Sequence, residues 1–327
     1  MTQTQQTTER EARAIATIAR RIADEVGRAV VGKTAEIDTA VATLLAGGHL
    51  LIEDVPGVGK TTLASALARG FGAEGTRIQF TSDMLPTDVT GVSVFDQATK
   101  EFRFHHGPVF ANVVVADEVN RSTPKTQSAL LEAMGEGRVT VDGTTYPLPN
   151  PFMVVATQNP QDMEGTFPLP EAQRDRFMAR ISLGYPSLEA EISLLEPRTA
   201  GGALAEIGAV VPLDQVVAAR RAVTRVHLAP EVGRYLVEIV AATRAHPGIV
   251  HGASPRASVH LSRMARAGAA MAGRPYVSPD DVATMAAAVL PHRLVTGDPY
   301  ASMADALAAA ERAVNDVVAR TAVRGLR

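Results

Sequence analysis

The chain has 327 residues, of which 46% are hydrophobic and 20% charged, and its formal net charge is −3. This composition is typical of a globular protein of about two domains, and it excludes a disordered or collagen-like chain. Cysteine is absent, which excludes thiol catalysis, disulfides and thiolate metal centres, and the slight acidic excess offers no overall electrostatic attraction for nucleic acid.

No part of the sequence predicts a membrane span or a secretion signal. The first dozen residues are polar, and the longest mainly apolar stretch, 41–52, is interrupted by Gly47, Gly48 and His49. We therefore expect a cytoplasmic protein with no membrane span.

Apolar residues spaced three and four positions apart predict a first helix at residues 8–30. Short apolar strands then alternate with helical segments, which predicts an α/β fold with a three-layer αβα core and a parallel sheet. The strands are expected at 49–53, 76–80, 112–117, 151–157 and 180–183. Between residues 81 and 110 the pattern changes to short alternating segments and turns, which indicates hairpins inserted into this core.

Strand signals stop near residue 184, and the remainder of the chain reads as helices. They are expected at 187–196, 213–226, 229–245, 255–272, 278–289 and 299–320. Ser278, Pro279 and the two acids after them form a favourable helix start. We therefore divide the chain into an N-terminal helical segment (1–30), an α/β domain (31–186) and a smaller all-α domain (187–327).

The segment from Asp54 to Thr62, DVPGVGKTT, joins the first strand to a helix and has the context of a phosphate-binding loop. Glycines in such a loop let backbone N–H groups surround a polyphosphate at the helix N-terminus. Lys60 is expected to reach the β- and γ-phosphates, and the Thr61 hydroxyl to hold Mg²⁺. The usual first glycine is replaced by Asp54, so the curl of the loop depends on the later glycines. The candidate nucleotide-binding residues are Pro56, Gly57, Val58, Gly59, Lys60, Thr61 and Thr62.

The strand at 112–117 ends in two adjacent acids, Asp117 and Glu118. Neighbouring side chains on a strand point to opposite sides, so the two can have different roles. Asp117 suits a Mg²⁺ shell, and Glu118 can polarise a water for attack on the γ-phosphate. Solvated acids at the end of a strand are the alternative, and the phosphate loop upstream disfavours it.

Three further polar residues are candidates because they accompany a phosphate loop and a pair of acids in the same chain. Asn159 follows the strand at 151–157 and can orient the attacking water, although Asn before Pro is more often a turn residue. Arg176 (with Arg174 as a second claimant) and Arg256 are candidates for neutralising charge in the transition state. Each arginine taken alone would be read as a surface ion-pair residue.

The ordered series EDVPGVGKTTLA, FANVVVADEVNRSTPKTQSALLEAM, VVATQNP, EGTFPLPEAQRDRF and GASPRA resembles the MoxR-type branch of the AAA+ ATPases, in the helix-2-insert clade. The resemblance implies an ATPase that uses ATP and Mg²⁺ and forms a ring, usually a hexamer. It identifies the Asp54–Thr61 loop with Walker A, Asp117 and Glu118 with Walker B, and Asn159 with sensor 1. By the same resemblance Arg176 is the arginine finger. Arg256 is sensor 2, acting on the nucleotide of its own subunit, while Val31 and Gly32 line the adenine pocket.

The resemblance also implies a function and a kind of partner. It indicates a chaperone-like remodelling or maturation factor whose clients include von Willebrand A-domain proteins, with an insert at about 81–110 that faces the pore of the ring. Five of the nine phenylalanines lie at 80–110, where they could contact a partner or simply pack the hairpin. The competing functions are a magnesium-chelatase-type motor subunit, a DNA-directed AAA+ motor, and a nucleotide-dependent switch that hydrolyses too slowly to do work. The acidic balance and the lack of a basic stripe disfavour direct binding of nucleic acid.

Overall fold

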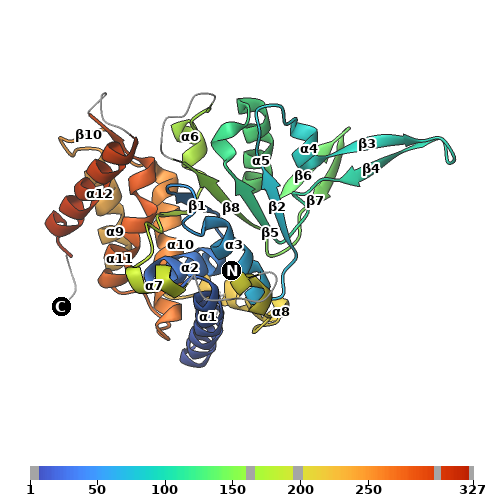
Figure 1. Cartoon of the computed structure of the whole chain (residues 1–327). Helices are drawn as coiled ribbons and strands as arrows, with labels where there is room; N and C mark the ends of the chain where they lie inside the picture. The colour runs from blue at the N-terminus through green and yellow to red at the C-terminus, as the bar shows by residue number, and fades with distance from the viewer. Residues whose placement is uncertain (1–6, 160–165, 194–201, 298–302, 324–327) are drawn as a thin grey trace, which may run out of the picture.

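The computed structural model describes residues 7–159, 166–193, 202–297 and 303–323 (Figure 1). At its centre is a five-stranded parallel sheet with the strand order β2-β5-β8-β1-β9. The strands are β1 (Leu50–Glu53), β2 (Gly75–Gln79), β5 (Val113–Asp117), β8 (Met153–Gln158) and β9 (Ala179–Ile181). All five expected strands are confirmed, with ends that differ by one or two residues.

Strand alternation divides the buried side chains between the two faces of the sheet. On one face, residues such as Val113 and Val115 join a core that includes α1, α2 and α3 and extends into the C-terminal helices. On the other face, Val114 and Ala116 pack with α5. Because both faces are covered, β5 and β8 are buried at every position, which explains their continuous apolar sequences.

The helices around the sheet include two, at 34–46 and 124–136, that the periodicity did not predict. The helices are α1 (Glu9–Ala29), α2 (Thr34–Ala46), α3 (Lys60–Gly70) and α5 (Pro124–Glu136). The helix α1 begins at a capping box in which the Thr8 hydroxyl accepts from Glu11 N–H and the Glu11 carboxylate accepts from Thr8 N–H. The helix α2 is mostly buried, so its sequence lacks the polar face that marks an amphipathic helix.

The expected insert is a short helix, α4 (Pro86–Thr90), followed by an antiparallel hairpin of β3 (Gly91–Asp96) and β4 (Glu101–His106). In Figure 1 this hairpin extends away from the body of the molecule. A second hairpin, β6 (Arg138–Val141) with β7 (Thr144–Pro147), follows α5 and was not predicted. Phe104 of the first hairpin stacks on Tyr146 of the second, with 4.3 Å between the ring centroids.

The C-terminal part is a helical lid, as expected. It contains α7 (Leu188–Ser193), α8 (Leu213–Val223), α9 (Pro230–Thr243), α10 (Pro255–Met271), α11 (Pro279–Val289) and α12 (Met303–Arg320), with short 3₁₀ turns η2 (Gly202–Glu206) and η3 (Pro291–Arg293). The predicted cap at Ser278 is confirmed. The expectation of no further strand was wrong, because β10 (Ile249–His251) and β11 (Val295–Thr296) form a small antiparallel pair. Within the described residues, no helix is both long and apolar enough to cross a bilayer.

Candidate active site

The loop between β1 and α3 curls at its two later glycines. Gly57 and Gly59 have φ values of +86° and +93°, in the left-handed region that side chains rarely adopt. A Cβ atom on either glycine would meet no atom within 4 Å, so their requirement is conformational and not one of space. The loop leads directly into α3, whose first residue is Lys60.

Lys60 lies at the carboxyl end of the sheet, where the residue is only 9% exposed. Its Nζ donates to the main-chain oxygens of Asp54, at 2.6 Å, and Gln158, at 3.4 Å. Burial lowers the pKa of this ammonium, although nearby carboxylates, Asp54 first among them, act in the opposite direction. The ammonium is therefore held between the ends of β1 and β8, where a phosphate on the loop would meet it.

Asp117, at the end of β5, is the centre of a hydrogen-bond cluster. Its Oδ2 accepts from the Thr61 hydroxyl at 3.0 Å and from Arg77 Nη2 at 2.7 Å, while its Oδ1 accepts from the Thr157 hydroxyl at 2.5 Å. Burial by itself raises the pKa of Asp117, but the hydrogen bonds from Thr157, Arg77 and Thr61 outweigh burial and hold the pKa below its usual value. Asp117 is therefore an anion whose position is fixed from three elements.

Glu118 turns away from the strand because its own backbone is left-handed, with φ 54° and ψ 48°. Its N–H donates to the Thr157 hydroxyl at 3.0 Å. Its carboxylate accepts from Gln79 Nε2 at 3.0 Å and from Arg121 Nη1 at 3.1 Å. The side chain stays 35% exposed, so it is open to the water that it is expected to polarise.

Hydrogen bonds connect the segment of the adenine-pocket candidates, Val31 and Gly32, to the phosphate loop. Asp54 Oδ2 accepts from the Ser182 hydroxyl at 2.9 Å and from Gly184 N–H at 2.6 Å, which ties the loop to the segment after β9. Lys33, next to Val31 and Gly32, donates from Nζ to the main-chain oxygen of Tyr185 at 3.0 Å. Asp54 in place of the usual glycine is therefore a structural anchor.

Asn159 follows β8 directly, at the same edge of the sheet as Lys60 and Asp117. Its main-chain oxygen accepts from Asn120 Nδ2 at 3.4 Å. The residues immediately after it, 160–165, lie outside the described part of the chain.

Arg176 lies at the opposite edge of the sheet. Its Nη1 donates to the main-chain oxygen of Leu131, in the second half of α5. The end of α5 is fixed at this edge because His49, just before β1, hydrogen-bonds through Nε2 to the oxygen of Met134 at 3.1 Å. The strand β1 lies between this edge and the phosphate loop, and its four residues span about 13 Å.

Arg256, at the start of α10, is at the same edge as Arg176. Its Nη1 lies 3.9 Å from Oδ2 of Asp175, which also accepts from the Ser254 hydroxyl, and Asp175 Oδ1 accepts from Arg293 Nε. Arg293 in turn donates to His260 Nδ1 at 2.6 Å. This placement does not support the expectation that Arg256 acts on the nucleotide of its own subunit.

One buried cation, Arg293, makes this lid contact electrostatically costly. Burial lowers the pKa of Arg293 to about 10, against the opposite influence of Asp175. Burial and the adjacent Arg293 lower the pKa of His260 to about 3, so this imidazole is neutral and accepts a hydrogen bond. Asp175 is thus the anion that holds the start of α10 and the turn η3 against the core.

The donor set fits Mg²⁺. The Thr61 hydroxyl and the Asp117 carboxylate lie 3.0 Å apart and supply the hard oxygen atoms that this ion prefers beside a phosphate. The Arg77 guanidinium contacts the same carboxylate oxygen, so Mg²⁺ would share or displace that contact.

Sequence reasoning missed four residues of the site: Arg77, Gln79, Thr157 and Asp175. Arg77 and Gln79 alternate on β2 and therefore share one side of the strand, which could have linked them to the acids on β5 had the pairing of the strands been known. Thr157 is the first polar residue in an otherwise apolar strand, and that interruption was its signal.

Comparison with protein families gives two matches. Residues 49–179 match the model of the ATPase family associated with various cellular activities (AAA). Residues 241–317 match the AAA lid domain. The two matches cover the strands β1, β2, β5 and β8 of the parallel sheet and the larger part of the helical lid.

Three similar proteins cover most of the chain. Protein YeaC of Bacillus subtilis is 48% identical over 272 residues, which are 83% of this chain and 85% of YeaC. Chaperone MoxR1 of Mycobacterium tuberculosis is 42% identical over 295 residues, 86% of this chain and 76% of MoxR1. The crystal structure of an ATPase from Cytophaga hutchinsonii aligns with a TM-score of 0.84 at 38% identity, covering 96% of this chain and 97% of that one.

Proposed function

This chain belongs to the MoxR-type AAA+ ATPases, and from the geometry of its site we propose that it is a Mg²⁺-dependent, ring-forming ATPase that remodels partner proteins. A cytoplasmic setting is part of the proposal. So are the division of the chain into residues 1–30, 31–186 and 187–327, and the site roles that follow.

The observation that carries the proposal is the separation of the site into two edges of one sheet. Lys60, Asp117 and Glu118 lie at the carboxyl edge, whereas Arg176 and Arg256 are tied to the amino edge. A guanidinium at the amino edge cannot reach a phosphate bound at the carboxyl edge of its own sheet. Both arginines can serve a nucleotide only if a second copy presents its phosphate loop to them, which is the head-to-tail contact that generates rings.

The chain's own residues then divide the work of phosphoryl transfer. The loop glycines and Lys60 hold the phosphates, and Glu118 orients and polarises the attacking water, with Asn159 assisting. Mg²⁺, held by Thr61 and Asp117, would supply charge neutralisation on the β- and γ-phosphates. Arg176, with Arg256 beside it, would neutralise the charge that develops on the neighbour's nucleotide.

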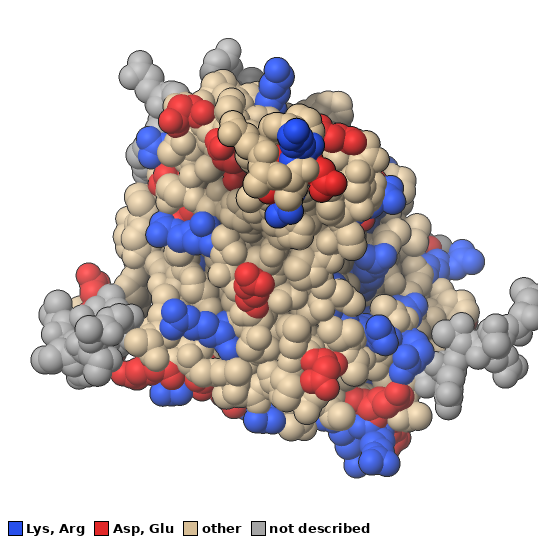
Figure 2. Space-filling model, turned by 90° about the vertical axis from the view of Figure 1, so that its right-hand side faces the viewer, with Lys and Arg blue, Asp and Glu red and all other residues tan. Residues whose placement is uncertain are grey.

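A protein client is favoured over nucleic acid by the surface of the hairpin β3–β4. Its exposed apolar side chains are Val92, Val94, Phe95 and Phe102, the last at 73% exposure. The acidic and basic residues around it are interspersed in Figure 2, with no continuous basic stripe on this face. Of the five phenylalanines at 80–110, Phe80 is buried, and Phe104 and Phe110 pack together at 5.7 Å, so only part of the set is available to a client. A hexameric ring and a von Willebrand A-domain client remain proposals on family grounds.

The test is to mix two inactive variants. Lys60→Ala removes the phosphate contact of a subunit, and Arg176→Ala removes the group that it offers to its neighbour. In a randomly mixed ring at equal ratio, about a quarter of the subunit boundaries pair an intact loop with an intact arginine, so about a quarter of wild-type ATP turnover should return.

The control mixes Lys60→Ala with the double variant Lys60→Ala/Arg176→Ala, in which no boundary is complete. The proposal fails if the first mixture stays as inactive as this control at every ratio, or if wild-type protein turns over ATP at full rate while sedimenting as a monomer. Turnover that survives removal of divalent cations by EDTA would refute the role of Mg²⁺.

A further inference from the structure

The residue before Asp54 carries a second buried carboxylate, Glu53, that the proposed mechanism does not use. Glu53 is the last residue of β1, and its side chain is 3% exposed. Its Oε2 accepts from Arg180 Nε at 3.0 Å. Its Oε1 accepts from the side-chain amide of Gln158, the last residue of β8.

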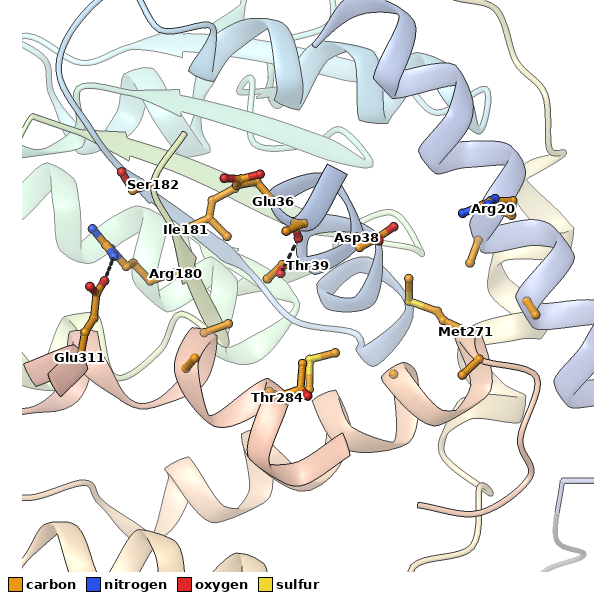
Figure 3. Close-up of a pocket in the computed structure, with 18 residues that line it drawn as sticks. Arg20, Glu36, Asp38, Thr39, Arg180, Ile181, Ser182, Met271, Thr284 and Glu311 are labelled. Carbon is orange, nitrogen blue, oxygen red and sulfur yellow. Dashed lines mark hydrogen bonds and ion pairs between the residues drawn. The ribbon is translucent and has the colours of Figure 1, made fainter. Parts of the chain in front are cut away.

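Arg180 extends this contact to the lid. It lies on the edge strand β9, and its Nη1 donates to Oε1 of Glu311, on α12, at 2.7 Å. Figure 3 shows the two side chains pointing toward each other at the side of a cleft of about 690 Å³. The cleft lies between α1, α2 and β9 on one side and α10, α11 and α12 on the other.

The Glu53–Arg180 contact is buried and hard to break, whereas the Arg180–Glu311 contact is partly exposed and can open. A buried carboxylate without a counterion costs several kcal/mol, so Glu53 must keep Arg180 wherever β1 and β9 move. Glu311 is 47% exposed, so water can replace its contact with Arg180 at little cost. Ala310 and Val314, on the same helix as Glu311, are buried in the core, so α12 would move together with the lid helices packed on it.

The inner end of the path lies at Lys60, in the candidate phosphate site. Gln158 directly precedes Asn159, and its main-chain oxygen accepts from Lys60. The Oε1 atom of Gln158 is buried and finds no donor among the described residues, so Glu53 is the recorded partner that orients this amide. A shift of β8 or of the phosphate loop when the γ-phosphate leaves therefore alters the position of Glu53, and with it that of Arg180.

We propose that Glu53, Arg180 and Glu311 form a coupling path in which Arg180 is a positioning residue that links the phosphate site to helix α12 of the lid. The inference rests on the proposed ATPase function, which supplies the change of state that the path transmits. Formation of the Arg180–Glu311 contact holds the lid in one position, and the nucleotide state sets how often that contact forms.

The experiment cuts the path at its exposed end with Glu311→Gln, which leaves the buried pair intact. We expect kcat for ATP to fall about fivefold with KM changed less than twofold, because the phosphate contacts are untouched. A second readout is the distance between spin labels on Ser128→Cys, in α5, and Glu231→Cys, in α9. Both positions are exposed and the chain has no other cysteine. The distance should change between ADP and a non-hydrolysable ATP analogue in the labelled wild-type background, and this change should shrink in Glu311→Gln.

The matched control is Asp316→Asn on the same helix, which alters a hydrogen bond to His246 and removes an ion pair to Arg320, neither of which leads to the phosphate site. The proposal is overturned if Glu311→Gln behaves like Asp316→Asn in both readouts. It is also overturned if the wild-type distance is the same with both nucleotides. Wild-type protein that binds ATP without hydrolysing it would refute the proposed function instead, and the distance measurement, which needs only binding, would still decide the coupling.

Discussion

Thr157 offers the sharpest test of how the acids of the site are held. Its hydroxyl donates to Asp117 Oδ1 at 2.5 Å and accepts from Glu118 N–H at 3.0 Å, and the residue is fully buried. Substitution by valine keeps the shape of the side chain and removes both hydrogen bonds. The change therefore isolates the hydroxyl.

The magnitude follows from the two contacts. A hydrogen bond to a charged group contributes about 1.5–3 kcal/mol, and a buried N–H left without a partner costs about 1–3 kcal/mol. Allowing for relaxation, Thr157→Val should lower the free energy of unfolding by about 3 kcal/mol. If the misplaced acids also raise the barrier to ATP hydrolysis by up to about 2.7 kcal/mol, turnover drops by up to 100-fold.

The assays are steady-state ATP turnover and urea unfolding, with Thr157→Ser as the control that keeps the hydroxyl. We expect Thr157→Ser to stay within about threefold of wild type in kcat, because its oxygen can make both contacts. Wild-type turnover and stability in Thr157→Val would refute the reasoning, since neither acid would then depend on this hydroxyl.

Two further predictions concern the lid contact and the loop anchor. The pKa of His260 is lowered to about 3 in the native state. As the pH falls below 6.5, His260 therefore binds a proton in the unfolded chain but not in the native one. Stability due to this residue should fall by about 1 kcal/mol between pH 6.5 and 5.5. Urea unfolding of His260→Gln should show a shallower pH dependence, and an unchanged slope would contradict the assignment. Asp54→Ala removes the acceptor for Ser182 and Gly184, so we expect ATP affinity to fall about tenfold by fluorescent-nucleotide titration, at a cost in stability of about 3 kcal/mol. Affinity equal to wild type would show that the anchor does not shape the loop.

The sequence predicted those features whose cause is local. The phosphate loop was recognisable because strand, glycines, Lys60 and helix are contiguous, and Gly57 and Gly59 need their backbone angles whatever surrounds them. The strands β5 and β8 were visible because burial on both faces demands unbroken apolar runs. The helix α2 was missed because burial of most of its residues weakens the amphipathic periodicity. The strands β10 and β11 were missed because two or three residues carry too little pattern.

Pairing between distant parts of the chain was decided by the tertiary structure. Thr157 contacts Asp117 because β8 lies beside β5, and Glu53 finds Arg180 because β9 lies beside β1. No local pattern encodes strand order, since it depends on how helices and lid pack over the whole sheet. The same holds for Arg256. Its motif was legible in the sequence, but only the packing of the lid against Asp175 placed it at the amino edge, away from the phosphate loop of its own chain.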